Sequence, residues 1–239
     1  REQGKVPEPV VWAVRTATQG DPPVSTPEGI DAERVTTWMQ EHAAEVAPPL
    51  SFELITGGHS NLTYRVADAE GRRWVLRRPP LKQVLATAHD MGREHRILSA
   101  LQPTNVPVPP LVGLCTDEAV SGAPFYVMDF VDGLIVRSTA ESDQLTVEQR
   151  ARAGASIVDV LARIHDVDID EVGLADFAKR EDYIPRQLKR WQGQFDKSRN
   201  RDLPVMDEVF TKLSACVPTQ GPAAIVHGDY RLDNCLIAA

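Results

Sequence analysis

The pattern of apolar and polar residues divides the chain into a β-rich part and a helical part. In the first part, short alternating or apolar runs bounded by glycine, proline and aspartate are typical of strands. They predict five strands, at residues 52–55, 62–66, 74–77, 111–115 and 125–130. Helical spacing predicts two helices in the same region, one from Asp31 to Pro48-Pro49 and one from about 88 to 101. In the first helix, Asp31 is positioned as the N-cap, and the apolar face comprises Ile30, Val35, Trp38, Met39 and His42.

Beyond Asp132-Gly133 the pattern becomes helical. Thr146 and Gln149 have the spacing of a capping box, which opens a long helix. Its predicted stripe comprises Ala151, Ala155, Val158, Leu161, Ala162 and His165. Further helices are predicted at 182–199 and 204–216, and Ala223 to Val226 is predicted as a short strand leading into His227.

These elements predict an α+β, protein-kinase-like fold of two lobes. We expect a flexible N-terminal extension at 1–29, and then a nucleotide-binding N-terminal lobe at 30–132, built of an antiparallel sheet and helices. Residues 133–239 are expected to form part of a mainly helical C-terminal lobe.

Composition narrows the class of protein. The chain has 239 residues, of which 42% are hydrophobic and 25% charged, as in soluble globular proteins. The net charge of −8 argues against a nucleic-acid partner. No apolar run is long enough to predict a membrane span, and the first residues lack the apolar core of a signal peptide. Three well-separated cysteines disfavour disulfides and zinc sites, so a cytoplasmic location is expected.

The last residues carry the most specific motif, a His-x-Asp followed by four residues and then Asn. Phosphoryl transfer requires a base for the attacking hydroxyl and an oxygen ligand for Mg²⁺ at this spacing. Asp229 is therefore the candidate catalytic base and Asn234 the candidate metal ligand. The alternative is a surface turn in which Asp229 and Asp233 cap backbone groups.

The pair Gly57-Gly58 lies in a loop between the first two predicted strands. Such a loop can turn its backbone N–H groups toward phosphate oxygens, and neighbouring polar side chains can add donors. The candidate nucleotide-binding residues here are Gly57, Gly58, His59, Ser60, Asn61 and Thr63. An ordinary hairpin or bulge explains the same pattern.

A cation on the third strand and an acid on the next helix complete a phosphate clamp. Arg77 ends that strand, and Glu94 lies within the predicted helix. Arginine is permanently charged and can bind phosphate through two N–H groups. A solvated ion pair of little energetic value is the alternative.

The run from Phe125 to Gly133 has the pattern of a strand leading into a hinge. The backbone at 129–131 could bind adenine, with Met128 and Phe130 near the ring. A simple buried strand has the same pattern. His165 is interpreted as a packing or helix-terminus residue without a catalytic role.

Together these motifs resemble the aminoglycoside phosphotransferase family, and most closely its bacterial branch related to the kinase-like domain of some acyl-CoA dehydrogenases. The resemblance covers about residues 30–239. It implies transfer of a γ-phosphoryl group from ATP or GTP, with Mg²⁺, to a hydroxyl of a small molecule. It also implies that Asp229 is the base, Asn234 a Mg²⁺ ligand, and Arg77 with Glu94 the phosphate clamp. The motifs that carry it are residues 57–64, 75–80, 93–96, 125–128 and 227–234.

Two departures leave a second hypothesis open. The family carries a metal-binding Asp on a strand beyond the catalytic loop, whereas this sequence ends at Ala239. We therefore expect the 239-residue segment alone to bind metal poorly and to be inactive. Arginine replaces the lysine of protein kinases, which favours a non-catalytic nucleotide-binding module as the alternative. A protein kinase is a weaker third interpretation, because Gly228 stands where arginine is usual.

Overall fold

The computed structural model describes residues 10–12, 27–55, 61–81 and 90–238. The chain separates into two compact units, one within residues 1–166 and 226–239 and the other at 167–225. The first unit holds the sheet and the catalytic-loop motif, and the second holds a pair of helices. The predicted lobe boundary at Asp132 lies inside the first unit, and the two-lobed division remains a prediction.

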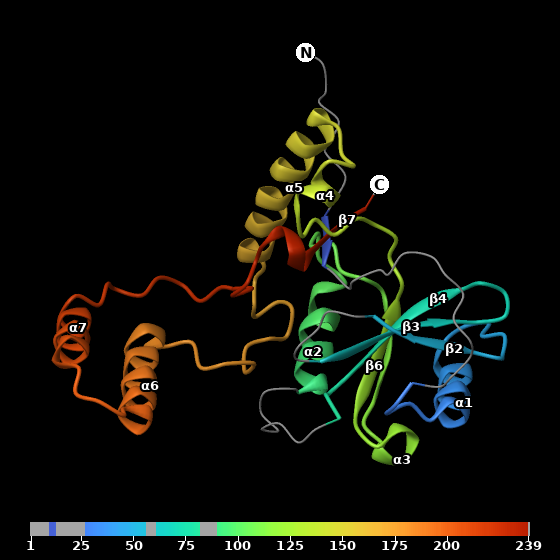
Figure 1. Cartoon of the computed structure of the whole chain (residues 1–239), viewed down its shortest axis with the longest axis horizontal. Helices are drawn as coiled ribbons and strands as arrows, with labels where there is room; N and C mark the ends of the chain where they lie inside the picture. The colour runs from blue at the N-terminus through green and yellow to red at the C-terminus, as the bar shows by residue number, and fades with distance from the viewer. Residues whose placement is uncertain (1–9, 13–26, 56–60, 82–89, 239) are drawn as a thin grey trace. The chain divides into compact units, whose positions relative to one another are not determined.

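The sheet of the first unit has five strands in the order β2-β3-β4-β6-β5, and every neighbouring pair is antiparallel (Figure 1). All five predicted strands are confirmed, with small shifts at their ends. Their bounds are Ser51–Leu54 for β2, Leu62–Ala67 for β3, Arg73–Arg78 for β4, Leu111–Cys115 for β5 and Phe125–Asp129 for β6.

The two faces of the sheet carry different residues because side chains alternate along each strand. Trp74 and Leu76 of β4 belong to a core cluster with Val35, Trp38 and Met39 of α1, which spans Ala32–His42. Val75, by contrast, packs with Met91 of α2, which spans Met91–Leu101. Figure 1 shows α1 and α2 on opposite sides of the sheet.

Both helices begin at an aspartate. The Asp31 carboxylate accepts from the N–H of Arg34 at 3.1 Å, which confirms the predicted cap of α1. Asp90 caps α2 in the same way, through the N–H of Arg93 at 2.9 Å. Residues 88 and 89, where this helix was predicted to begin, lie outside the described part of the chain. Helix α1 ends at His42, earlier than the predicted stop at Pro48-Pro49.

The long helix α5 spans Val147–Asp166, and its predicted capping box is present. Thr146 N–H donates to Gln149 at 2.8 Å, and Gln149 N–H donates back to Thr146 at 3.2 Å. The predicted stripe is wrong, because Ala151, Ala155, Val158, Ala162 and His165 are exposed. The buried residues are Ala153, Ser156, Val160 and Ile164.

Near the C-terminus, a 3₁₀ turn at Leu232–Asn234 leads into β7, Cys235–Ile237. Strand β7 pairs with β1, Val10–Trp12, from the segment predicted to be a flexible extension. Ile237 also exchanges two backbone hydrogen bonds with Leu134, of 2.9 and 2.8 Å. The prediction of a strand at Ala223–Val226 is wrong: no strand forms there, and Val226 is 73% exposed. An apolar run needs a neighbouring strand to pair with, and the described residues supply none.

The second unit contains α6, Tyr183–Ser198, and α7, Pro204–Ala215, which confirms both predicted helices. No residue of either helix is buried. Two one-turn helices, α3 at Glu118–Ser121 and α4 at Thr139–Ser142, belong to the first unit. Within the described ranges, no helix combines the length and apolar character needed to span a bilayer.

Candidate active site

Three neighbouring strands present one polar residue each at the same level of the sheet. Thr63 of β3 is the cross-strand partner of Arg77 of β4, and Arg77 is the partner of Tyr126 of β6. All three lie on the α2 side of the sheet, because Val75 and Tyr126 pack with Met91. This register places three polar side chains beside Glu94 of α2.

The carboxylate of Glu94 is the centre of this group. Arg77 Nε donates to Glu94 Oε2 at 3.2 Å, and the Tyr126 hydroxyl donates to the same oxygen at 3.0 Å. Asn61 Nδ2 donates to the other oxygen, Oε1, at 2.5 Å. Arg77 also donates to Thr63 Oγ1 at 3.4 Å. The expected contact between Arg77 and Glu94 is therefore present, and both carboxylate oxygens have fixed partners.

Sequence reasoning missed Tyr126. A signal was available: side chains alternate along a strand, so in the predicted strand 125–130 Tyr126 had to share a face with Met128. Its partner on β4, however, depends on the order of the strands in the sheet.

Burial and charge set the protonation of this group. Burial alone would lower the pKa of Arg77, but the neighbouring Tyr126 and Glu94 outweigh it and raise that pKa. Burial raises the pKa of Tyr126 well above its usual value, and Arg77 opposes this shift only in part. At neutral pH the guanidinium thus stays charged and the phenol keeps its proton, so that both donate to Glu94.

The catalytic-loop motif forms a tight turn in which Gly228 has a φ of +84°, a conformation that favours glycine. Asn234 Nδ2 donates to the Asp229 carboxylate at 2.7 Å and to the Asp229 carbonyl at 2.9 Å. Arg231 Nε lies 3.4 Å from Asp229 and 2.9 Å from Asp233. Asp229 and Asn234 are thus held together, and the side chain of Asp229 remains 65% exposed.

Two aromatic rings anchor this turn. The Tyr230 hydroxyl donates to the carbonyl of Ile157 in α5 at 2.9 Å. Its ring packs edge-on against His227, whose Nδ1 accepts from the N–H of Asp229 at 3.2 Å. Burial lowers the pKa of His227, although the charge of Asp229 opposes the shift. A neutral imidazole accepts this hydrogen bond and fixes the backbone at Asp229.

The segment after β6 has fewer open backbone groups than expected. Asp129 N–H donates to Pro110 O at 2.8 Å, and Phe130 N–H donates to Arg73 O at 3.2 Å. Met128 is buried, and the Arg73 guanidinium covers the Phe130 ring at 4.6 Å. Within the described residues, the N–H of Val131 makes no hydrogen bond. In the backbone at 129–131, predicted to bind adenine, the N–H groups of Asp129 and Phe130 therefore already have partners within the protein.

Several predicted residues are not brought together by observed contacts. Gly57, Gly58, His59 and Ser60 lie outside the described residues. In the parts of the chain that are described, no hydrogen bond or ion pair links the group around Glu94 to the Asp229 turn. The same residues contain no cluster of three or more His, Cys, Asp or Glu side chains that could hold a metal ion.

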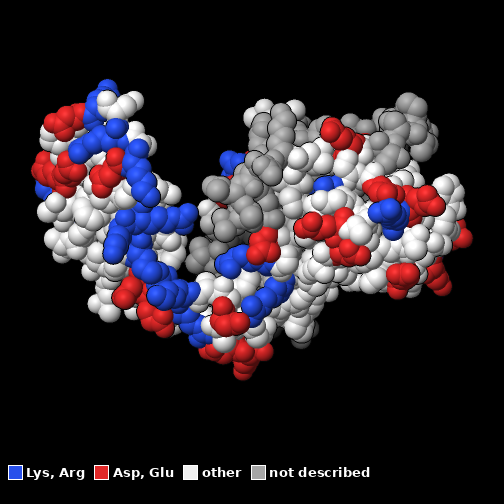
Figure 2. All heavy atoms as spheres, turned by 90° about the horizontal axis from the view of Figure 1, so that it is seen from below, with Lys and Arg blue, Asp and Glu red and all other residues white. Residues whose placement is uncertain are grey.

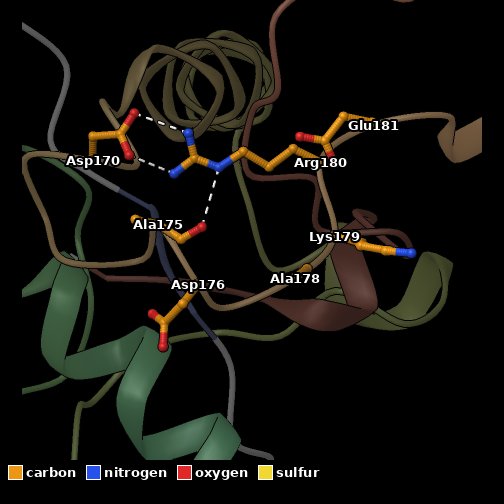
Figure 3. Close-up of a pocket in the computed structure, with 7 residues that line it drawn as sticks. All are labelled: Asp170, Ala175, Asp176, Ala178, Lys179, Arg180 and Glu181. Carbon is orange, nitrogen blue, oxygen red and sulfur yellow. Dashed lines mark hydrogen bonds and ion pairs between the residues drawn. The ribbon is translucent and has the colours of Figure 1, made fainter.

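A surface hollow of about 530 Å³ lies in the second unit (Figure 3). Arg180 spans it with two hydrogen bonds to Asp170, of 2.9 and 2.5 Å, and a third to Ala175 O at 3.2 Å. None of the predicted site residues lines it. Its central guanidinium is held by Asp170 and Ala175, and we assign the hollow no role in the site.

Positive charge is concentrated in one segment of the same unit, residues 179–201, against the acidic balance of the whole chain. Figure 2 shows Lys and Arg gathered in a band on this unit. Between residues 179 and 201 three residues are acidic and eight are basic, namely Lys179, Arg180, Arg186, Lys189, Arg190, Lys197, Arg199 and Arg201. Net charge alone is therefore a poor guide to the charge of a substrate.

The described structure thus combines a sheet flanked by α1 and α2, an Arg–Glu pair on β4 and α2, and an Asp–Asn turn, as expected of a kinase-like fold. The profile described as "Phosphotransferase enzyme family" matches residues 51–238, and the chain belongs to this family.

Proteins related in sequence support this membership. Acyl-CoA dehydrogenase family member 10 of Mus musculus is 36% identical over 188 residues, which are 79% of this chain and 17% of that protein. Acyl-CoA dehydrogenase family member 11 of Gallus gallus is 32% identical over 80% of this chain and 24% of its own length. The chain thus spans about a quarter or less of these relatives.

Two solved structures share the fold. A Ralstonia eutropha protein described as a "putative aminoglycoside phosphotransferase" is 33% identical, with a TM-score of 0.73 over 87% of this chain and 60% of that one. Macrolide 2'-phosphotransferase MphH from Brachybacterium faecium is 16% identical, with a TM-score of 0.56 over 87% of this chain and 68% of its own. The predicted kinase-like α+β fold is confirmed.

Proposed function

We propose that this chain forms the catalytic part of a kinase that transfers the γ-phosphoryl group of ATP or GTP to a hydroxyl of a small molecule. The observation that carries the proposal is the turn in which Asn234 holds the exposed carboxylate of Asp229. Membership of the phosphotransferase family supports the same chemistry.

Asp229 would act as the base. Its carboxylate accepts from Asn234 and lies near the Arg231 guanidinium, so its position is fixed while one face stays open to solvent. A hydroxyl donor bound there could pass its proton to the carboxylate as the new bond to phosphorus forms. His227 and Tyr230 support this geometry by fixing the turn against α5.

Arg77 would bind the nucleotide phosphates. Glu94 holds its Nε, which leaves the other guanidinium N–H groups to face anionic oxygens. The glycine loop, Gly57 and Gly58 with His59, Ser60 and Thr63, would supply further donors, and the backbone at 129–131 would bind the base next to Met128 and Phe130.

Asn234 suits one position of a Mg²⁺ site. Its Nδ2 faces Asp229, so its Oδ1 is the end left for a cation, and phosphate oxygens commonly complete such a site. When bound, Mg²⁺ would offset the charge that develops on the transferred phosphoryl group. We further propose that the protein acts in the cytoplasm and without nucleic-acid or membrane partners.

The decisive variants are Asp229→Ala and Asp229→Asn, made in the protein that carries this chain. We expect kcat to fall roughly 10²- to 10⁴-fold in both, because the base is lost in each. Release of ADP or GDP with a panel of hydroxyl acceptors would be measured. Asp233→Asn is the matched control, since this neighbouring acid binds Arg231 and has no role in the transfer. Near-normal turnover of both Asp229 variants would refute the proposed role.

The alternative is a nucleotide-binding module without catalysis, which Arg77 in place of lysine favours. It predicts a nucleotide-dependent rise in the unfolding temperature, with no acceptor phosphorylation in the wild-type protein and no response of either readout to Asp229→Asn. The kinase predicts turnover that depends on Asp229.

A further inference from the structure

The proposed phosphate clamp contains a buried phenol that no part of the proposed chemistry uses. Tyr126 is 2% exposed, and its hydroxyl donates to Glu94 Oε2, the same oxygen that accepts from Arg77 Nε. Tyr126 and Arg77 are also direct cross-strand partners on β6 and β4. A buried hydroxyl aimed at the acid of the clamp is placed to control where that acid points.

We propose that Tyr126, together with Asn61, is a positioning residue that fixes the Glu94 carboxylate so that Arg77 faces the nucleotide phosphates. This inference rests on the proposed function and deepens it. Both residues contact Glu94, and we assign neither a contact with the transferred group. They therefore act on the clamp through Glu94.

The geometry favours positioning over general packing, since the two donors hold the two ends of one carboxylate. Asn61 holds Oε1, and Tyr126 with Arg77 holds Oε2. A carboxylate with one anchored oxygen can still rotate about its last bond, whereas two anchored oxygens fix its plane. The fixed carboxylate then determines where the Arg77 Nε can bind. Because the guanidinium is planar, this also sets the direction of its remaining N–H groups.

Asn61 thereby takes a different role from the one predicted. It was expected to donate to phosphate from the glycine loop, but its amide donates to Glu94. Because Asn61 directly precedes β3, its bond ties the start of that strand to α2. We infer that the strand, the helix acid and the cation form one unit.

The sheet supplies a matched control on its opposite face. Tyr64 is 1% exposed, and its hydroxyl donates to Glu28 O at 3.0 Å, within the cluster packed against α1. Tyr126→Phe and Tyr64→Phe each delete one buried hydroxyl and one hydrogen bond while keeping the ring. They should destabilise the protein to a similar degree, but only Tyr126→Phe alters the clamp.

The test measures the dissociation constant of MgATP or MgGTP by calorimetry, and the KM of nucleotide and of acceptor in the transfer assay. We expect Tyr126→Phe and Asn61→Ala each to weaken nucleotide binding roughly 3- to 30-fold, because each removes a donor that holds the Glu94 carboxylate independently of Arg77. The KM of the acceptor should stay within twofold, as should nucleotide binding by Tyr64→Phe. In a Glu94→Gln background, Tyr126→Phe should have little further effect, since the two residues act as one unit.

Equal nucleotide affinities of Tyr126→Phe and Tyr64→Phe would overturn the positioning role and leave the proposed function intact. Additive losses in the Glu94→Gln background would overturn it as well. If the wild-type protein bound no nucleotide at all, the proposed function itself would fail, and this inference with it.

Discussion

Asn234 donates from one amide nitrogen to both the carboxylate and the backbone carbonyl of Asp229, at 2.7 and 2.9 Å. These two bonds close the turn at 229–234 on itself and orient the carboxamide, with its oxygen facing away from Asp229. One side chain therefore both braces the proposed base and leaves its oxygen for the proposed cation.

Removal of this side chain should impair catalysis in two ways. We expect Asn234→Ala to lower turnover roughly 10- to 100-fold, as is usual when a metal ligand or the group that orients it is lost. The Mg²⁺ concentration for half-maximal activity should rise, and a Mg²⁺ titration of turnover would measure it. An unchanged Mg²⁺ requirement would show that Asn234 only braces Asp229.

Replacement of Arg77 separates charge from geometry. Arg77→Met should lower the free energy of unfolding by roughly 1–3 kcal/mol, between the values for exposed and buried ion pairs, because both partners are partly exposed. It should also weaken nucleotide binding. Arg77→Lys should restore part of that binding, since a lysine supplies charge but not the planar fork. Equal affinity of the Met and Lys variants would contradict a phosphate role, and calorimetric titration would decide.

The segment that packs against the C-terminal strand β7 depends on a glycine, Gly133. A Cβ at Gly133 would lie 2.2 Å from Leu236 Cδ2 and 2.7 Å from the Ile237 carbonyl oxygen, whereas a Cβ at Gly154 in α5 would meet nothing within 4 Å. We expect Gly133→Ala to destabilise the protein by on the order of 1–3 kcal/mol. Gly154→Ala should stabilise it by about 0.5–1 kcal/mol. Denaturant midpoints at constant slope would test the pair, and a neutral Gly133→Ala would contradict the close approach.

Asp68 predicts a pH dependence of stability. Burial alone would raise its pKa, but donors from Ala47 and Arg72 outweigh burial and hold that pKa below its usual value. A carboxylate with a lowered folded-state pKa stabilises the fold above its unfolded pKa and loses that contribution as pH falls through the folded value. Asp68→Asn should therefore be less stable than wild type at pH 7, and the difference should begin to shrink below about pH 4 and decrease further as pH falls through the folded-state pKa. Urea unfolding at a series of pH values from 7 downward would test this, and a difference that stayed constant over the acid range would refute it.

The strands could be predicted from sequence because their pattern is local. Alternation in residues 74–77 separates Trp74 and Leu76 from Val75 and Arg77, and the structure assigns these pairs to opposite faces. The caps of α1 and α5 were equally local, since Asp31 and Thr146 bond within three residues.

The buried face of α5 could not be predicted in this way. Its apolar residues form two stripes of similar spacing, and small alanines contribute to both. Which of the two stripes is buried depends on residues distant in sequence, such as Tyr230, whose hydroxyl donates to the carbonyl of Ile157. The role of Tyr126 was hidden for the same reason, because sequence predicts a strand but not which strand lies next to it.

The alternation of side chains between the two faces of β4 limits the insertions and deletions that this strand can tolerate. Deletion of a single codon between Trp74 and Arg77 would exchange the two sides of the strand, sending a permanently charged guanidinium into the apolar cluster beneath α1 and an indole or leucine toward Glu94. Length changes in this strand should therefore be tolerated only in steps of two, whereas many single substitutions would survive.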